Sequence, residues 1–137
     1  MFTNLRLAEG GKDYRKELVS LGRIVTHGIT FDTGSDVIKP DSGPTLRDIL
    51  KILQEDGKLQ FEVQGHTDDQ GGAKVNEPLS QRRATAVKAW LVKQGVGEAR
   101  LRVKGLAATK PIDSNETAEG RANNRRVEFV RLSGPAI

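Results

Sequence analysis

Residues 59–94 read LQFEVQGHTDDQGGAKVNEPLSQRRATAVKAWLVKQ, and they predict a strand, a polar loop and a helix in succession. Over residues 59–64, Leu, Phe and Val alternate with Gln and Glu, which is the two-residue period of a half-buried strand. The run at 68–78 is polar and contains two adjacent glycines, so we expect a loop there. A helix is expected over 79–94, because its apolar residues recur at helical spacing and Gly95 is a typical C-terminal stop.

The same two periods recur on both sides of this stretch. Further strands are expected at 25–31, 101–104 and 127–132, and further helices at 12–21, at 41–56 and, in short form, after a loop at 107–118. In the first strand, one face is expected to hold Val25, His27, Ile29 and Phe31. The order β-α-β-α-β-(short α)-β predicts an α+β fold, a two-layer sandwich with helices packed on one mixed four-stranded sheet.

Composition narrows the class of protein. The 137 residues are 36% hydrophobic and 29% charged, which indicates one folded domain and excludes a disordered chain. We expect residues 1–22 to form a lead-in with a short helix, and residues 133–137 to form a tail. The absence of cysteine excludes disulfides and thiolate chemistry.

Charge is unevenly distributed along the chain. Residues 1–68 hold 9 Lys and Arg against 11 Asp and Glu, a net −2, whereas residues 69–137 hold 13 against 7, a net +6. Such a basic half is typical of a protein with an anionic partner, and equally of one with scattered Lys and Arg on solvated faces. A nucleic-acid module is one alternative, but an aromatic content of 4% leaves few side chains for stacking on bases.

Catalysis and metal binding find little support in the sequence. The two histidines do not have metal-ligand spacing, and no nucleophile elbow, P-loop or dinucleotide motif is present. We expect no cofactor, no metal and no catalytic residue. His66 is expected to hydrogen-bond the loop at the end of its strand, and the alternative is a hydrolase or amidase that uses His66 with Asp68 or Ser80.

Arg83 stands out on the helical wheel. At about 100° per residue it lies within about 40° of Val87 and about 20° of Trp90, on the stripe expected to be buried near the helix N-terminus. A buried guanidinium needs an anion, and a helix N-terminus favours one at the same place. Asp68 ends the neighbouring strand. Two interpretations follow: an Asp68–Arg83 salt bridge, or a clamp in which Asp68 binds an ammonium and Arg83 binds a carboxylate in bidentate fashion.

Three segments carry a family resemblance: FDTGSDVIKP at 31–40, GHTDDQGGAKVNEPLSQRRA at 65–84 and GRANNRRVEF at 120–129. Together they resemble the OmpA-like C-terminal domain family, which includes peptidoglycan-associated lipoproteins and the periplasmic domain of MotB. The resemblance covers about residues 23–132. It implies a non-enzymatic domain that binds peptidoglycan non-covalently through the diaminopimelate of the stem peptide, and so anchors an envelope protein to the cell wall.

The resemblance also implies roles for individual positions. Asp68 is expected to bind the diaminopimelate amino group and Arg83 its carboxylate, while Asn76 orders the loop or bonds the ligand. The remaining expected contacts are the backbone of Phe31 and Asp32, with Thr67 and Arg125 as second contacts.

Localisation follows from the same resemblance. We expect the domain in the periplasm, in a protein attached to the outer or inner membrane. Its expected partner is peptidoglycan and not nucleic acid, and the sequence does not decide whether it forms a homodimer. The first residues do not form a signal peptide, because Arg6, Glu9 and Lys12 interrupt any apolar run. The chain is therefore expected to be a fragment of an exported protein, or to carry an added Met1.

Overall fold

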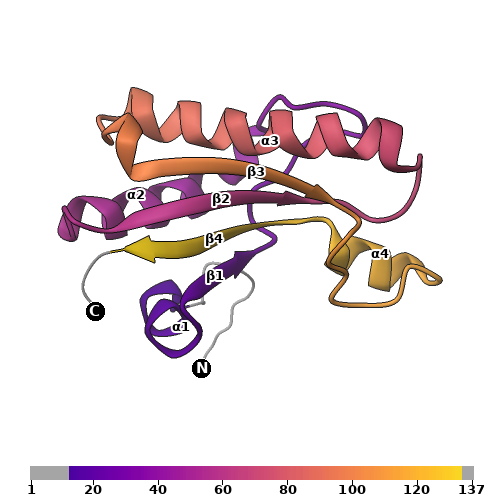
Figure 1. Ribbon diagram of the computed structural model, residues 1–137, viewed down its shortest axis with the longest axis horizontal. Coiled ribbons are helices and arrows are strands. Elements are labelled where there is room, and N and C mark those ends of the chain that lie inside the picture. The colour runs from indigo at the N-terminus through magenta and orange to yellow at the C-terminus, as the bar shows by residue number, and fades with distance from the viewer. Residues whose placement is uncertain (1–12, 134–137) are drawn as a thin grey trace.

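Residues 13–133, the part of the chain that the computed structural model describes, form helices packed on one mixed four-stranded sheet (Figure 1). The strands are β1 (Arg23–Thr26), β2 (Gln60–His66), β3 (Leu101–Ala107) and β4 (Arg126–Ser133). The helices are α1 (Tyr14–Leu21), α2 (Gly43–Glu55), α3 (Ala73–Lys93) and α4 (Ala118–Asn124), with 3-10 turns at Pro40–Ser42 and Glu98–Arg100. The predicted α+β fold is confirmed. The lead-in before residue 13 and the tail after residue 133 lie outside the described residues.

The sheet has the order β1-β4-β2-β3. β4 pairs antiparallel with both β1 and β2, whereas β2 and β3 are parallel. Parallel neighbours need a crossover, and α3 supplies it. Figure 1 shows α3 lying along β3, and α4 standing at the end of the sheet where β3 gives way to β4.

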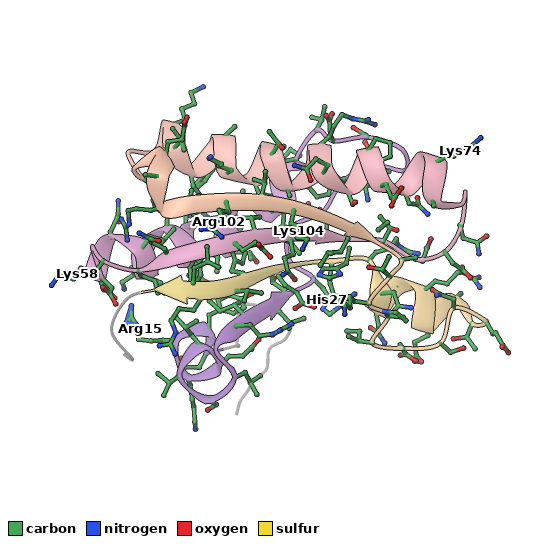
Figure 2. The ribbon with its side chains drawn as sticks, in the orientation of Figure 1. Arg15, His27, Lys58, Lys74, Arg102 and Lys104 are labelled. Atoms are coloured by element: carbon green, nitrogen blue, oxygen red, sulfur yellow. The ribbon has the colours of Figure 1, made fainter. Side chains whose placement is uncertain are left out.

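One face of the sheet carries the core. The rings of Phe61 and Phe129 meet there with centroids 5.7 Å apart. The helices add buried side chains to the same core, namely Tyr14 and Leu18 from α1, Leu46, Ile49 and Leu53 from α2, and Ala84, Val87 and Leu91 from α3. On the opposite face of β3, Arg102 and Lys104 are exposed (Figure 2). The alternation seen in the sequence therefore separates core from solvent on this strand, as predicted.

The first strand differs from its prediction in length and in phase. β1 ends at Thr26, and Ile24 and Thr26 are buried while Val25 is only half-buried. The register decides this, because β1 pairs with β4 so that Ile24 lies opposite the core residue Phe129. The alternation that continues through residues 27–31 belongs to a loop. Phe31 makes only an isolated bridge with Ile38.

Helix α3 begins at Ala73, six residues before the predicted start, so much of the expected loop is helical. The amide N–H of Asn76 already donates to the carbonyl of Gly72 at 3.0 Å. Pro78 lies inside the helix, where it cannot donate to the carbonyl of Lys74. The predicted end is confirmed, since the helix stops at Lys93 and Gly95 adopts a positive φ of 107°.

Two glycines set the height of α3 above the sheet. Gly65 of β2 and Gly105 of β3 lie side by side in the register. A Cβ on Gly65 would overlap the carbonyl oxygen of Ser80, and one on Gly105 would overlap the backbone of Gln81. The Ser80 hydroxyl also accepts the N–H of Ala107 at 3.1 Å. This close approach brings the turns of α3 on either side of Ser80 to the end of β2.

Candidate functional site

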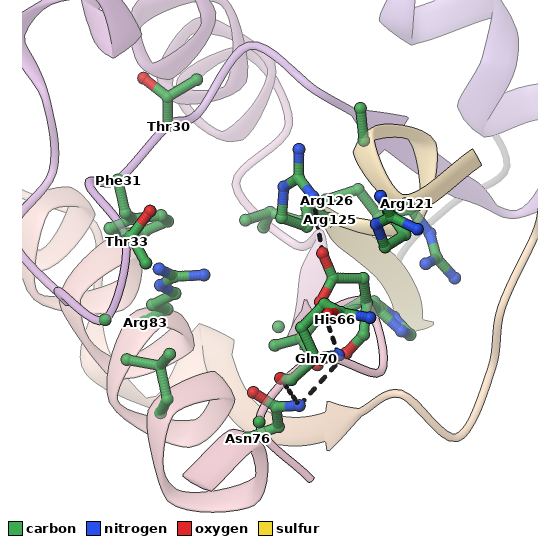
Figure 3. Close-up of a pocket in the computed structure, with 18 of the residues that line it drawn as sticks. Thr30, Phe31, Thr33, His66, Gln70, Asn76, Arg83, Arg121, Arg125 and Arg126 are labelled. Carbon is green, nitrogen blue, oxygen red and sulfur yellow. Dashed lines mark hydrogen bonds and ion pairs between the residues drawn. The ribbon is translucent and has the colours of Figure 1, made fainter. Parts of the chain in front are cut away.

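A pocket of about 940 Å³ opens where β2 ends, between the segment after β1, the first half of α3, and α4 with the start of β4 (Figure 3). It is lined by six of the seven predicted site residues, namely Phe31, Thr67, Asp68, Asn76, Arg83 and Arg125. The seventh, Asp32, is exposed and does not line the pocket, but its carbonyl accepts a hydrogen bond from Arg83 at 3.1 Å. The fold thus brings the predicted residues together, and their contact with a ligand stays a prediction.

Asp68 is held at the pocket floor. Its Oδ1 accepts the N–H of Gln70 at 3.0 Å, and its Oδ2 accepts a hydrogen bond from Nη1 of Arg125 at 2.6 Å. The preceding residue is fixed as well, because the Thr67 N–H donates to the carbonyl of Ala107 at 2.9 Å. The Asp68 side chain is 11% exposed, so its carboxylate still reaches the pocket.

The loop around Asp68 is ordered by Asn76 and by an unusual backbone at the end of β3. The Asn76 amide donates to the carbonyl of Asp68 at 3.2 Å and to that of Gln70 at 2.8 Å. Asn76 therefore orders the loop, which is one of the two roles expected of it. Ala107, opposite His66 at a register shift, has a φ of 50°, a conformation that costs energy for a residue with a side chain.

Arg83 is positioned by the loop that follows β1. Its Nε donates to the carbonyl of Ser35 at 2.8 Å, and its guanidinium lies over the ring of Phe31, 4.9 Å from the centroid. Burial and the nearby charge of Arg125 lower the pKa of Arg83, while Asp36 and Asp68 oppose this effect. An arginine so shifted is still a cation at neutral pH.

Two expectations about Arg83 need correction. The side chain is half-buried rather than fully buried, and it lies three turns into α3, too far from the helix N-terminus for the dipole to act on it. The salt-bridge interpretation also fails, because Asp68 pairs with Arg125 while Arg83 bonds backbone carbonyls. Among the described residues, Asp68 and Arg83 thus share a pocket without being each other's partner.

A buried ionic cluster lies beside the pocket. Arg126 donates to Glu128 at 2.6 Å, and to the carbonyls of Asn124 at 2.9 Å and Lys110 at 2.7 Å. Nε2 of His66 lies 3.8 Å from Glu128. Burial would raise the pKa of Glu128, but the hydrogen bond from Arg126 and the surrounding positive charge lower it below the usual value.

His66 is a neutral structural side chain. Burial, followed by the charge of Arg126, lowers its pKa to about 4. Its Nε2 lies 3.1 Å from the amide oxygen of Gln64 and donates to it, and its Nδ1 has no hydrogen-bond partner in the described part of the chain. Ser80 donates instead to the carbonyl of Glu77 at 3.0 Å. The hydrolase alternative therefore lacks its base, because His66 is engaged by neither Asp68 nor Ser80.

Residues 13–133 lack two kinds of feature. No group of three or more His, Asp or Glu side chains in this range could hold a metal ion. No helix in it is both long enough and apolar enough to cross a membrane.

Several pocket residues were missed by sequence reasoning. The carbonyl of Ser35 holds Arg83, and the backbone N–H of Gln70 holds Asp68. No side-chain pattern reports such contacts, because every residue carries these backbone groups. His27 and Arg121, which also line the pocket, were missed for a different reason: the folding of the segment after β1 against α4 joins them.

Comparison with known proteins gives consistent matches. Residues 30–125 match the OmpA family. The chain is 45% identical over 104 residues to the probable lipoprotein YiaD of Escherichia coli, covering 76% of this chain and 48% of that protein. It is 35% identical over 124 residues to the outer-membrane lipoprotein YfiB of Pseudomonas aeruginosa, covering 90% of this chain and 73% of that protein. The chain therefore spans about half the length of the Escherichia coli relative.

Solved structures agree with these sequence matches. The peptidoglycan-associated lipoprotein of Burkholderia pseudomallei superposes with a TM-score of 0.70 at 29% identity, over 76% of this chain and 88% of that one. The cell wall anchor of the T6SS from Pseudomonas aeruginosa superposes with a TM-score of 0.68 at 31% identity, over 81% of this chain and 80% of that one.

Proposed function

Because this chain belongs to the OmpA family, we propose that it binds peptidoglycan non-covalently through the diaminopimelate of the stem peptide. Domains of this family bind peptidoglycan and are not enzymes. One observation carries the finer proposal: Asp68 and Arg83, of opposite charge, line one pocket while each is held by other groups. Such a pair suits a ligand that brings one cation and one anion.

The chemistry of diaminopimelate fits this pair. The free end of its side chain carries an ammonium and a carboxylate on one carbon. The ammonium binds Asp68, whose carboxylate oxygens each accept more than one hydrogen bond. The carboxylate binds the guanidinium edge of Arg83 that the loop carbonyls leave open, since Nε and Nη2 are engaged by Ser35 and Asp32 and Nη1 is not. A lysine side chain ends in an amine alone and offers nothing to Arg83.

The relatives support a place in the cell envelope. YiaD is described as a probable lipoprotein and YfiB as an outer-membrane lipoprotein, while one structural relative is a cell wall anchor. We place this domain in the periplasm, where it anchors a parent protein of the outer or inner membrane to the cell wall.

Sedimentation with insoluble sacculi tests the proposal. Asp68→Asn and Arg83→Gln are each expected to weaken binding by about 2–4 kcal/mol, the range for losing one half of a desolvated charge pair. The adjacent exposed residues provide matched controls, because Asp69→Asn and Arg82→Gln make the same chemical changes outside the pocket. Wild-type retention by a well-folded Asp68→Asn or Arg83→Gln variant would contradict the proposal.

Calorimetry with soluble muropeptides tests the finer part. Diaminopimelate-type peptides are expected to bind, and lysine-type peptides of the same length are expected to bind at least tenfold more weakly, about 1.4 kcal/mol. Equal affinity for the two would leave peptidoglycan binding in place and remove the proposed role of the amino-acid head. Release of fragments from purified peptidoglycan would instead indicate the hydrolase alternative.

A further inference from the structure

The pocket carries more positive charge than the single carboxylate of one amino-acid head can neutralise. Within residues 13–133, Asp68 is the only carboxylate that lines it, whereas four guanidinium groups do, namely Arg83, Arg121, Arg125 and Arg126. Glu128 compensates Arg126 inside the buried cluster. Among the described lining residues, three cations thus face one anion, and Asp36, which lies outside the lining, also acts on Arg83. An amino-acid head is neutral overall, so its binding leaves this imbalance unchanged.

Arg125 stands on the wall opposite Arg83. Figure 3 shows Arg83 beside Phe31 and Thr33 on one side of the pocket, with Arg121 and Arg125 on the other. The Arg125 side chain is 50% exposed, and its Nη1 bonds Asp68. Across the pocket, the charge of Arg125 contributes to lowering the pKa of Arg83, after burial itself. The two guanidinium groups therefore repel each other through the space that a ligand would fill.

The wall that carries Arg125 is rigid. The side chain of Asn124 accepts the N–H groups of Ile112 at 2.7 Å and Asp113 at 2.9 Å, which ties the preceding loop to α4. Gly120 packs so closely on Ser114 that a Cβ would overlap the Ser114 carbonyl oxygen. Arg125 therefore projects from a fixed position next to Asp68.

Ligand binding changes the partner of Arg125. An ammonium on Asp68 shares that carboxylate with Arg125 and brings two cations close together in a partly desolvated site. Arg83 already takes the carboxylate of the head. Arg125 then shares its only anionic partner, Asp68, with the ammonium. A second carboxylate of the ligand on this side of the pocket would give Arg125 a full partner.

Resting on the proposed function, we propose that Arg125 forms a second carboxylate subsite, which binds the free C-terminal carboxylate of the stem peptide. That carboxylate belongs to diaminopimelate itself or to the residue after it, a short distance along the peptide from the head. Arg121, from the preceding turn of α4, flanks the subsite. The domain then selects uncross-linked stems, because a cross-link consumes the free amine or the free terminal carboxyl.

Calorimetry with two matched muropeptides tests this proposal. Both carry a free diaminopimelate head, and they differ only in a C-terminal carboxylate against a carboxamide. Wild-type protein is expected to prefer the carboxylate form by about tenfold to hundredfold, the worth of one hydrogen bond to a charged group. In Arg125→Gln the preference is expected to fall to about twofold or less, while the carboxamide form binds as well as before or better, since Asp68 loses a competing partner.

Arg102→Gln serves as the matched control, because it removes the same charge from the exposed face of β3 and should keep the full preference. Equal binding of the two muropeptides by wild type, or a full preference retained by Arg125→Gln, would overturn the second subsite. Failure of the proposed function looks different: neither muropeptide binds wild type, or Asp68→Asn binds both as wild type does.

Discussion

Two neighbouring arginines, Arg125 just before β4 and Arg126 at its first position, form ion pairs that differ in burial. Arg125 is 50% exposed and reaches Asp68 through one nitrogen, at the edge of a pocket. Arg126 is almost completely buried, and all three of its guanidinium nitrogens donate, to Glu128 and to two backbone carbonyls. One ion pair is open to a ligand, and the other is closed.

Under the proposed function, this difference separates a ligand-binding pair, Asp68–Arg125, from a structural pair, Glu128–Arg126. The two carboxylates are also unequal, because Glu128 accepts from Arg126 and from Arg23 at 2.8 Å, whereas Asp68 accepts from Arg125 and one backbone N–H. A closed network holds the sheet together only while every member is present. An open pair keeps hydrogen-bonding capacity for something that is not part of the protein.

Removing one partner of the buried Arg126–Glu128 pair is expected to have the largest effect on stability. Arg126→Met leaves Glu128 buried with less than its full set of donors, so the free energy of unfolding should fall by about 3–5 kcal/mol. Arg125→Met is the matched change in the open pair and should cost less than about 1 kcal/mol. Urea unfolding of both variants measures the contrast. Equal losses would show that exposure does not distinguish the two pairs.

Acid is expected to lower the free energy of unfolding through the buried cluster of His66, Arg126 and Glu128. The folded-state pKa of His66 is about 4, below the usual 6.5, so the unfolded chain binds a proton more readily between these values. Stability is therefore expected to fall as pH decreases from about 6.5 to about 4, by about 3 kcal/mol when complete. The lowered pKa of Glu128 adds a loss in the same direction below about 4.5.

Substitution assigns that pH window to one residue. His66→Gln is expected to flatten the change in stability between about pH 6.5 and about pH 4.5, where Glu128 does not yet contribute. Chemical denaturation at a series of pH values gives the slopes, and a wild-type slope in His66→Gln would place the acid sensitivity elsewhere.

The next smaller effect on stability is expected where α3 packs on β2 at Gly65. Gly65→Ala places a methyl group against the Ser80 backbone, which cannot move aside as a flexible side chain would. We expect a loss of about 1–3 kcal/mol in stability, with weaker muropeptide binding because α3 carries Arg83. Gly57→Ala is the control, since its Cβ meets nothing within 4 Å. Thermal unfolding and calorimetry on both variants test whether close packing serves the site.

Sequence reasoning predicted most of the elements and named residues that the fold brings to one pocket, but it did not predict their hydrogen-bond partners. Alternation and helical spacing predicted β2, β3, β4 and α2, but gave β1 the wrong length and phase. The motifs named Asp68 and Arg83, which line one pocket. The start of α3 was missed because glycines and Pro78 hid a helix that tertiary packing stabilises. The partner of Asp68 was missed because Arg125 reaches it from the end of α4, 57 residues away along the chain.

The smallest effect is expected on the exposed face of β3, where Arg102 and Lys104 contribute to the basic half of the chain. If the pocket alone recognises the ligand, Arg102→Gln with Lys104→Gln should leave muropeptide affinity unchanged. Raising the salt concentration from about 50 to about 200 mM should cost wild type little, because few charge contacts are involved and they are partly buried. A polyanion that followed the basic face would instead release counterions, and its affinity would fall steeply. A salt titration of muropeptide and DNA binding on one preparation measures both. A steep slope for the muropeptide, or tight DNA binding lost in the double variant, would move recognition from the pocket to this face.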